Sequence, residues 1–215
     1  GILVAVVTPA IMKTRPNKNK MMVKKTFYAT EQIVNSLIND EILYPDMREA
    51  CRTNQDNGND IYCAWGFDYV YEANQEGEIY EGENKFGALF KSRLNVSKNV
   101  ASSKDGKAPN GTDYYPIFYT SDGVKWDLTG TKDAWEDSKK PGTFDNQTNA
   151  AGIGTILIDV NGDEGPDVAC TMDVGAEDCD QYEIQILANG KLRINPDHER
   201  AVQWTTINTS IRDSI

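Results

Sequence analysis

The stretch Gly1-Ile-Leu-Val-Ala-Val-Val-Thr-Pro-Ala-Ile-Met12 contains no charged residue, and the first charge follows at Lys13. As a helix this run would be roughly 18 Å long, which is shorter than the ~30 Å hydrocarbon core of a bilayer. We therefore expect either the buried end of a helix or the second half of a membrane-embedded helix. Pro9 should kink or locally melt such a helix, because proline lacks an amide donor and clashes with the preceding turn.

The residues after this run argue against a cleaved leader and favour a longer helix. A secretory signal peptide would end in a small-residue cleavage site, but Lys13-Thr14-Arg15-Pro16 follows instead. Residues 17–43 read as a long amphipathic helix, because apolar side chains recur every three to four positions. These side chains are Val23, Phe27, Val34 and Leu37 or Ile38. Asn39-Asp40 and Tyr44-Pro45 predict where the helix ends. We expect residues 1–44 to form an N-terminal helical part, with an apolar half at 1–12 and an amphipathic half at 17–43.

The remaining residues, 45–215, read as a globular head of mixed elements. A short helix is expected over Lys85–Leu94, and strands over 67–71 and 154–160. Two hairpins are expected, because Ser121-Asp122-Gly123 and Asn189-Gly190 are turn signals between alternating segments. Their strands are 114–120 with 124–128, and 182–187 with 191–194.

The segment Gly1–Ala10 resembles the later half of the N-terminal helix of type IV pilins and type II secretion pseudopilins. In that family a glycine, an aliphatic run and a helix-interior proline recur in this order, which places Gly1 and Pro9 on the family's positions. The resemblance implies that further mature residues, including a terminal Phe and a buried Glu, precede Gly1. Pieces of the head are also similar to pilin-like proteins. They are Leu94-Asn95-Val96, Ser121 to Trp126, Asp159-Val160-Asn161-Gly162, Gly165-Pro166-Asp167 and Asp180-Gln181-Tyr182.

The resemblance implies an α+β fold in which the long N-terminal helix packs on an antiparallel sheet. It implies a structural subunit of an extracellular filament at the cell surface, not an enzyme. Its partners would be copies of itself, after a membrane-anchored, periplasm-facing stage in the inner membrane. The residues expected to carry assembly are Ile2, Leu3, Val4, Val6, Val7, Pro9 and Ile11. The alternative is a membrane-anchored surface binding or adhesion module that does not polymerise and uses acidic loops able to hold calcium.

The four cysteines fall into two local pairs, Cys51 with Cys63 and Cys170 with Cys179. Their spacings do not match a zinc site, which needs close pairs of thiol or imidazole ligands. Four cysteines allow three disulfide connectivities, and we favour the two local ones because each closes a short polar loop. Each could contribute ~2–3 kcal/mol in the loop-entropy model. Disulfides would place the chain in an oxidising compartment, whereas reduced cysteines are the alternative.

The acidic turn after the expected strand 154–160 is a candidate calcium site. Asp159, Asn161, Asp163 and Asp167 offer oxygen ligands at alternating spacing, and calcium takes six to eight oxygens. The turn is not an EF-hand loop, because its glycine comes at the fourth place and Cys170 stands where the bidentate Glu should be. Some pseudopilins carry calcium in a C-terminal loop. The alternative is a solvated turn whose side chains cap backbone amides.

The distribution of charge points to partners and excludes some classes of function. The net charge is −11, which argues against general nucleic-acid binding because phosphates would be repelled. Subtracting the six basic residues before Glu31 from the total of 22 leaves 16 against 33 acidic residues, a charge of −17 for the rest. The six are Lys13, Arg15, Lys18, Lys20, Lys24 and Lys25.

Sequence signals for catalysis are weak. The sequence has no nucleophile elbow, zinc-protease motif or phosphate loop. Its single histidine, His198, lies in a polar tail and is expected to be exposed. Four Asn-X-Ser/Thr sequons begin at Asn95, Asn110, Asn146 and Asn208. They mark exposed loops if the host glycosylates them, and chance explains them as well.

Overall fold

The computed structural model describes residues 17–40, 43–44, 84–108, 110–132, 134–135, 144, 152–187 and 189–206. The helices are α2 (Lys18–Ile38), α3 (Lys85–Ser92) and α4 (Glu199–Thr206), with short 3-10 turns η1 (Ala101–Ser103) and η2 (Thr129–Thr131). The strands are β1 (Val96–Asn99), β2 (Ile117–Thr120), β3 (Lys125–Asp127), β4 (Ile153–Asp159), β5 (Val168–Ala169), β6 (Cys179–Leu187) and β7 (Leu192–Ile194). The apolar run with its seven assembly residues, the expected strand 67–71 and the Cys51–Cys63 pair lie outside the described residues.

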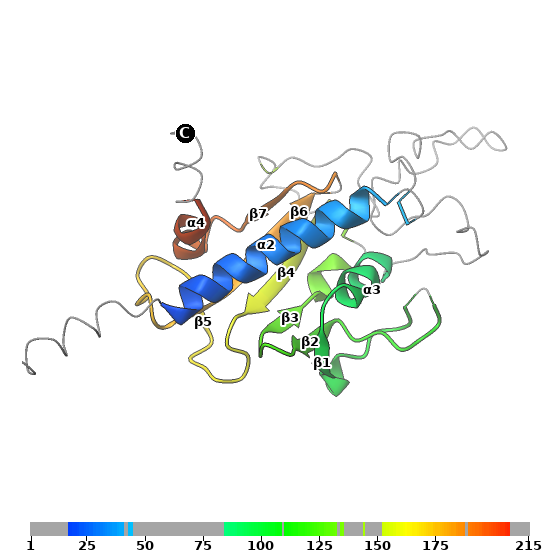
Figure 1. Cartoon of the computed structure of the whole chain (residues 1–215), viewed down its shortest axis with the longest axis horizontal. Helices are drawn as coiled ribbons and strands as arrows, with labels where there is room; N and C mark the ends of the chain where they lie inside the picture. The colour runs from blue at the N-terminus through cyan, green and yellow to red at the C-terminus, as the bar shows by residue number, and fades with distance from the viewer. Residues whose placement is uncertain are drawn as a thin grey trace, which may run out of the picture.

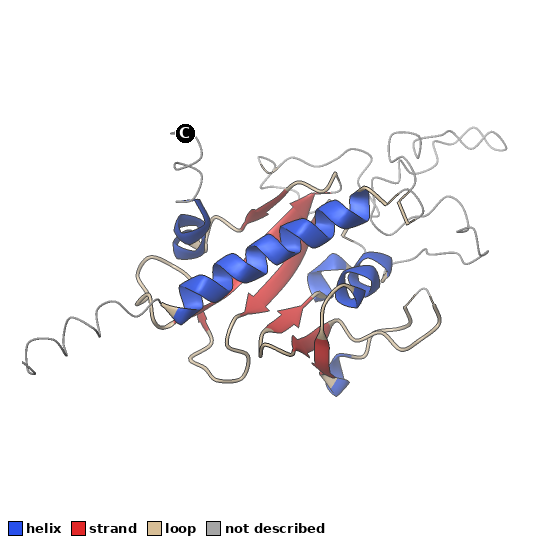
Figure 2. Ribbon diagram, in the orientation of Figure 1, coloured by secondary structure: helices blue, strands red, loops and turns tan. Residues whose placement is uncertain are grey.

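The strands form one mostly antiparallel sheet, and α2 lies along one of its faces (Figures 1 and 2). The order is β1-β2-β3-β4-β6-β5, and β7 also pairs with β6. Every pairing is antiparallel except that of β5 with β6. The fold class α+β, with a helix on a largely antiparallel sheet, is therefore confirmed. The two predicted hairpins are present as β2–β3 and β6–β7.

The start and the buried stripe of helix α2 agree with the sequence prediction, whereas its end does not. Asn17 is the N-cap, and its side chain accepts a hydrogen bond from the amide of Lys20 at 2.8 Å. Buried positions recur at a spacing of three to four; they are Val23, Thr26, Thr30, Val34 and Leu37. The helix ends at Ile38, earlier than the predicted residue 43, where the amide of Asp40 bonds to the carbonyl of Leu37, three residues back, and the Asn39 side chain donates to the carbonyl of Asn35.

The core lies between α2 and the sheet. Inward side chains of the two longest strands are buried, whereas Leu157 on the outward face of β4 is 39% exposed. The inward residues are Ile156, Ile158, Tyr182, Ile184 and Ile186. The Tyr182 hydroxyl lies 2.6 Å from Thr26 Oγ1 and donates to the carbonyl of Val23 at 3.3 Å. Thr26 thus lies in the buried stripe in place of Phe27, which is only half-buried.

The C-terminal tail differs from the expectation of a polar, exposed segment. It forms α4, whose Ala201 and Trp204 are buried, and α4 contacts α2. His198 lies just before α4 and is half-buried, so its predicted exposure is wrong. Burial lowers the pKa of His198, because the charged imidazolium would lose hydration. The sequence did not indicate this burial, because the amphipathic pattern of α4 is only eight residues long and the helix reaches the core only where the chain folds back.

Candidate functional site

The acidic turn joins β4 to β5 and is held in an unusual backbone path. Gly162 has φ +68, and a Cβ at this position would lie 2.5 Å from the carbonyl oxygen of Gly123, so only glycine fits. Asp167 has φ 60, in the left-handed region that a residue other than glycine adopts infrequently. The turn is therefore shaped by specific contacts, although Asp163, Glu164, Pro166 and Asp167 along it are exposed.

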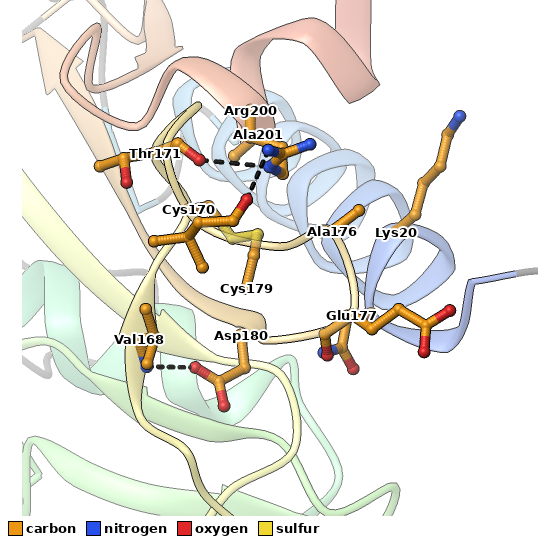
Figure 3. The surroundings of a disulfide bond; sticks show 12 residues. Lys20, Val168, Cys170, Thr171, Ala176, Glu177, Cys179, Asp180, Arg200 and Ala201 are labelled. Carbon is orange, nitrogen blue, oxygen red and sulfur yellow. Dashed lines mark hydrogen bonds between the residues drawn. A yellow bond between two sulfur atoms is a disulfide. The ribbon is translucent and has the colours of Figure 1, made fainter.

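Asp180, near the start of β6, supplies most of these contacts. Its side chain is fully buried, and one carboxylate oxygen accepts hydrogen bonds from Asn161 Nδ2 at 3.1 Å and from the amide of Asp167 at 3.0 Å. The other oxygen accepts from the amide of Val168 at 2.6 Å (Figure 3). Asn161 Nδ2 also donates to the carbonyl of Gly165 at 3.1 Å. Asp180 thus anchors the turn to the edge of the sheet.

Asp159, at the end of β4, is the second buried carboxylate. It is 4% exposed and accepts hydrogen bonds from the amide of Asn161 at 3.3 Å and from Gln181 Nε2 at 3.1 Å. Burial is the main cause that raises the pKa of the Asp159 carboxyl to about 6; the side chains of Asp167 and Asp180 also raise it, and the hydrogen bonds from Gln181 and Asn161 oppose the shift. Either a bound proton or a nearby cation would therefore stabilise the Asp159 carboxylate.

The structure brings together three of the four predicted calcium ligands. Asp159, Asn161 and Asp167 share the turn, whereas Asp163 accepts a hydrogen bond from the Tyr119 hydroxyl and lies 3.8 Å from Lys125 Nζ. Asn161 Oδ1 is buried and has no hydrogen-bond partner in the described part of the chain, so this oxygen fits a cation ligand. Asp163 does not fit. Among the described residues, no group of three or more Asp, Glu, His or Cys could hold a metal ion as it stands.

Beside the turn lies the disulfide loop, which we define as residues 170–179. Cys170 and Cys179 are bonded and fully buried, as expected from the local pairing. Arg200 of α4 clamps the loop: its Nε donates to the carbonyl of Thr171 at 3.2 Å (Figure 3). Its Nη2 donates to the carbonyls of Met172 at 2.9 Å and of Val174. One guanidinium therefore satisfies three loop carbonyls. The Cys51–Cys63 pairing stays a prediction.

The opposite side of the disulfide loop contacts the N-terminus of α2. Asn17 Nδ2 donates to the carbonyl of Ala176 at 2.7 Å, and Asn19 Nδ2 donates to that of Glu177 at 3.1 Å. Figure 3 shows the Lys20 side chain pointing away from this contact. The loop thus joins α4 to the point where the chain enters α2. Sequence reasoning missed Arg200, because no local pattern links it to the loop carbonyls.

The basic residues of α2 have different surroundings. Lys25 forms an ion pair with Asp122 at 2.8 Å in the β2–β3 turn, and the two side chains are 60% and 33% exposed. Lys18 is exposed, and Met21 between these lysines is 53% exposed. The first turns of α2 therefore present a basic surface with an apolar side chain in it. Lys13 and Arg15 lie outside the described residues.

No protein-family model, curated protein or solved structure matches the chain. In the part of the chain that the structure describes, no helix is long and apolar enough to cross a membrane.

Proposed function

We propose that this chain is a structural subunit of an extracellular type IV pilus or pseudopilus-like filament, and not an enzyme. The observation that carries the proposal is the placement of α2. It lies along an antiparallel sheet, and the uncharged run Gly1–Met12 precedes its N-cap by only a few residues. An antiparallel head on a helix whose sequence continues into an apolar run suits a subunit that polymerises through that run.

The physical argument concerns where the apolar run can be buried. An uncharged run of this length is unfavourable in water, so it must find lipid before assembly and neighbouring helices afterwards. The disulfide Cys170–Cys179 supports an oxidising location such as the periplasm or the cell surface. Its loop contacts the start of α2 through Asn17 and Asn19, which stabilises the point where the head meets the run.

The test replaces Val4 and Val7 with Asp in the full chain, expressed in its own host. Filaments should be lost, because an unpaired carboxylate in an apolar bundle costs several kcal/mol. The matched control replaces the same two residues with Ile. Electron microscopy of sheared surface filaments, with mass spectrometry of their subunit, is the readout. Circular dichroism of the purified chain should show an unchanged head. Normal filaments from the Asp variant would remove the central-bundle model.

The second candidate is a membrane-anchored surface module that does not polymerise and holds calcium in its acidic turn. One observation favours a calcium role: the orphaned oxygen of Asn161 lies in the same turn as the buried Asp159 and the exposed Asp167. Calcium binding is compatible with either candidate, so filament formation separates them. A wild-type chain that stays cell-bound as a monomer, with nothing in the sheared fraction, would select the second.

A further inference from the structure

One loop of the head carries a sequon in an exposed and ordered turn. The loop between η1 and β2 includes Asn110-Gly111-Thr112, and all three residues are exposed. The amide of Ala108 donates to the carbonyl of Thr112 at 2.8 Å, and the amide of Gly111 donates to the carbonyl of Ala108 at 2.8 Å. Below the tip, Asp113 pairs with Lys104 at 2.7 Å and with Lys107. The sequon is therefore displayed on a braced loop tip.

Within this tip the sequon is arranged for reaction at the side-chain nitrogen of Asn110, Nδ2. The amide of Thr112 donates to Asn110 Oδ1 at 3.1 Å, and the Thr112 hydroxyl donates to the same oxygen at 2.7 Å. Two donors on this oxygen stabilise the negative charge that develops there when the amide nitrogen loses a proton. Asn110 Nδ2 makes no hydrogen bond within the described residues, so it is available to a reagent.

The sequon at Asn95 is arranged in the opposite way. Asn95 Nδ2 donates to Ser121 Oγ at 2.9 Å, and the Ser97 hydroxyl donates to the carbonyl of Tyr119 at 3.1 Å. Val96 between them begins β1, which pairs with β2. The nucleophilic nitrogen and the sequon hydroxyl are therefore both engaged in the fold. The remaining sequons, at Asn146 and Asn208, lie outside the described residues.

A hollow of about 640 Å³ lies between α3 and this loop, and Asn110 and Thr112 are part of its wall. The wall combines polar groups, such as Lys91 and Ser92, with apolar ones, such as Leu89 and Leu94. Lys91 Nζ is fixed by Asn99 Oδ1 and by the carbonyl of Tyr115, both at 2.7 Å. A sugar has hydroxyl edges and apolar ring faces, so a mixed wall beside Asn110 offers contacts to both.

We propose that Asn110 is an acceptor for N-linked glycosylation and that the first sugar lies over this hollow. The donor class is an oligosaccharide linked through pyrophosphate to a lipid. Asn110 Nδ2 attacks the anomeric carbon of the first sugar and forms the N–C bond, while the bond from that carbon to the pyrophosphate oxygen breaks. The pyrophosphate leaves with the electron pair, and the nitrogen gives one proton to a base of the transferase. This inference does not depend on filament formation.

The test uses the folded, oxidised full chain, with Asn146 and Asn208 replaced by Gln so that only two sequons remain. It is incubated with a single-subunit oligosaccharyltransferase that accepts Asn-X-Ser/Thr, and with a lipid-pyrophosphate-linked oligosaccharide. Glycopeptide mass spectrometry should find glycan at Asn110 and none at Asn95. The tryptic peptides 94–98 and 108–125 are the unfolded controls, and both should be modified. Equal modification of the two sites in the folded chain, or an unmodified Asn110, would overturn the proposal.

A second variant separates the turn from the sequon. In Gly111→Ala an added Cβ has open space around it, but φ +80 is strained for alanine, so the turn should change while the sequon stays intact. The folded Gly111→Ala chain should lose modification at Asn110, whereas its 108–125 peptide should keep it. Thr112→Ser keeps the hydroxyl and should keep modification. A folded Gly111→Ala chain that is glycosylated like the parent would show that the turn does not direct the reaction.

Discussion

Asp159 at the end of β4 and Asp180 near the start of β6 are both buried carboxylates beside the acidic turn, but they have different partners. Asp180 accepts three hydrogen bonds, two of them from backbone amides. Asp159 accepts two and also faces the side chain of Asp167 and the charge of Asp180. The charged form of Asp159 is buried and, in addition, poorly compensated, which is why its pKa rises to about 6.

Replacing Asp159 with Asn should change how stability depends on pH. Between about pH 4 and pH 6 the native Asp159 holds a proton that the unfolded chain has lost. The free energy of unfolding therefore falls as pH rises through this window, and Asp159→Asn removes that contribution. Near pH 7 the variant should be more stable by up to about 3 kcal/mol. Urea unfolding across pH 4–7, read as the difference from the parent, measures it.

One control and one calcium experiment accompany this prediction. Glu164→Gln removes one negative charge from the exposed side of the same turn without touching the buried carboxylates. If the turn binds calcium, the ion should stabilise the parent at pH 7, because a ligand bound only to the native state raises the melting temperature by mass action. A chelator should reverse that rise, and Asp159→Asn should reduce it. A melting temperature that changes with neither calcium nor chelator would show that the turn is purely structural.

At the scale of elements, the disulfide loop depends on one arginine. Arg200 reaches three loop carbonyls because the guanidinium is a planar fork, whereas a lysine ammonium is a point charge on a flexible stem. Arg200→Lys keeps the charge but should loosen residues 171–178 and lower stability by about 1–2 kcal/mol. Cleavage after Glu177 by a glutamate-specific protease should become faster.

Arg193→Lys is the matched control for this element. Arg193 on β7 donates to Gln185 Oε1 at 2.8 Å and takes no part in the disulfide loop. Its substitution should leave cleavage after Glu177 unchanged. Equal cleavage of Arg200→Lys and the parent would mean that the disulfide and the Asn17 and Asn19 contacts hold the loop without the clamp.

At the scale of the whole molecule, the charge is asymmetric. The basic residues gather before and within the first turns of α2, and the acidic turn and disulfide loop lie near the same end of that helix (Figure 1). One of these basic residues already has a partner within the chain, since Lys25 pairs with Asp122. Exposed pairs of this kind contribute only ~0–1 kcal/mol each. In a filament, the basic residues would be repeated along the shaft, where like charges repel one another.

Reversing Lys18, Lys20 and Lys24 to Glu should therefore impair filament assembly, and raised salt should weaken wild-type filaments by screening. The control exchanges Lys25 and Asp122 for Glu and Lys, which preserves that pair within the subunit. Sheared filament yield at low and high salt is the measurement. Normal assembly of the triple variant, with filaments indifferent to salt, would assign the basic run to the lipid headgroup surface.

The sequence by itself determined the features that depend on near neighbours. The stripe of α2 follows a period of 3.6, the hairpins β2–β3 and β6–β7 follow turn chemistry, and the Cys170–Cys179 pair is close in the chain. Each of these needs only local spacing, so the helix, the two hairpins and the local disulfide could be predicted.

Only the tertiary structure decided which distant groups meet. Asp180 pins a turn that begins some 20 residues earlier, Arg200 clamps a loop about 30 residues away, and Asn17 caps α2 while binding Ala176. Two Asn-X-Ser/Thr sequons also diverge, because Asn95 beside β1 donates to Ser121 whereas Asn110 lies on a loop tip. Hydrogen bonds between segments far apart in the chain leave no periodic trace in the sequence, since each partner is by itself an ordinary polar residue.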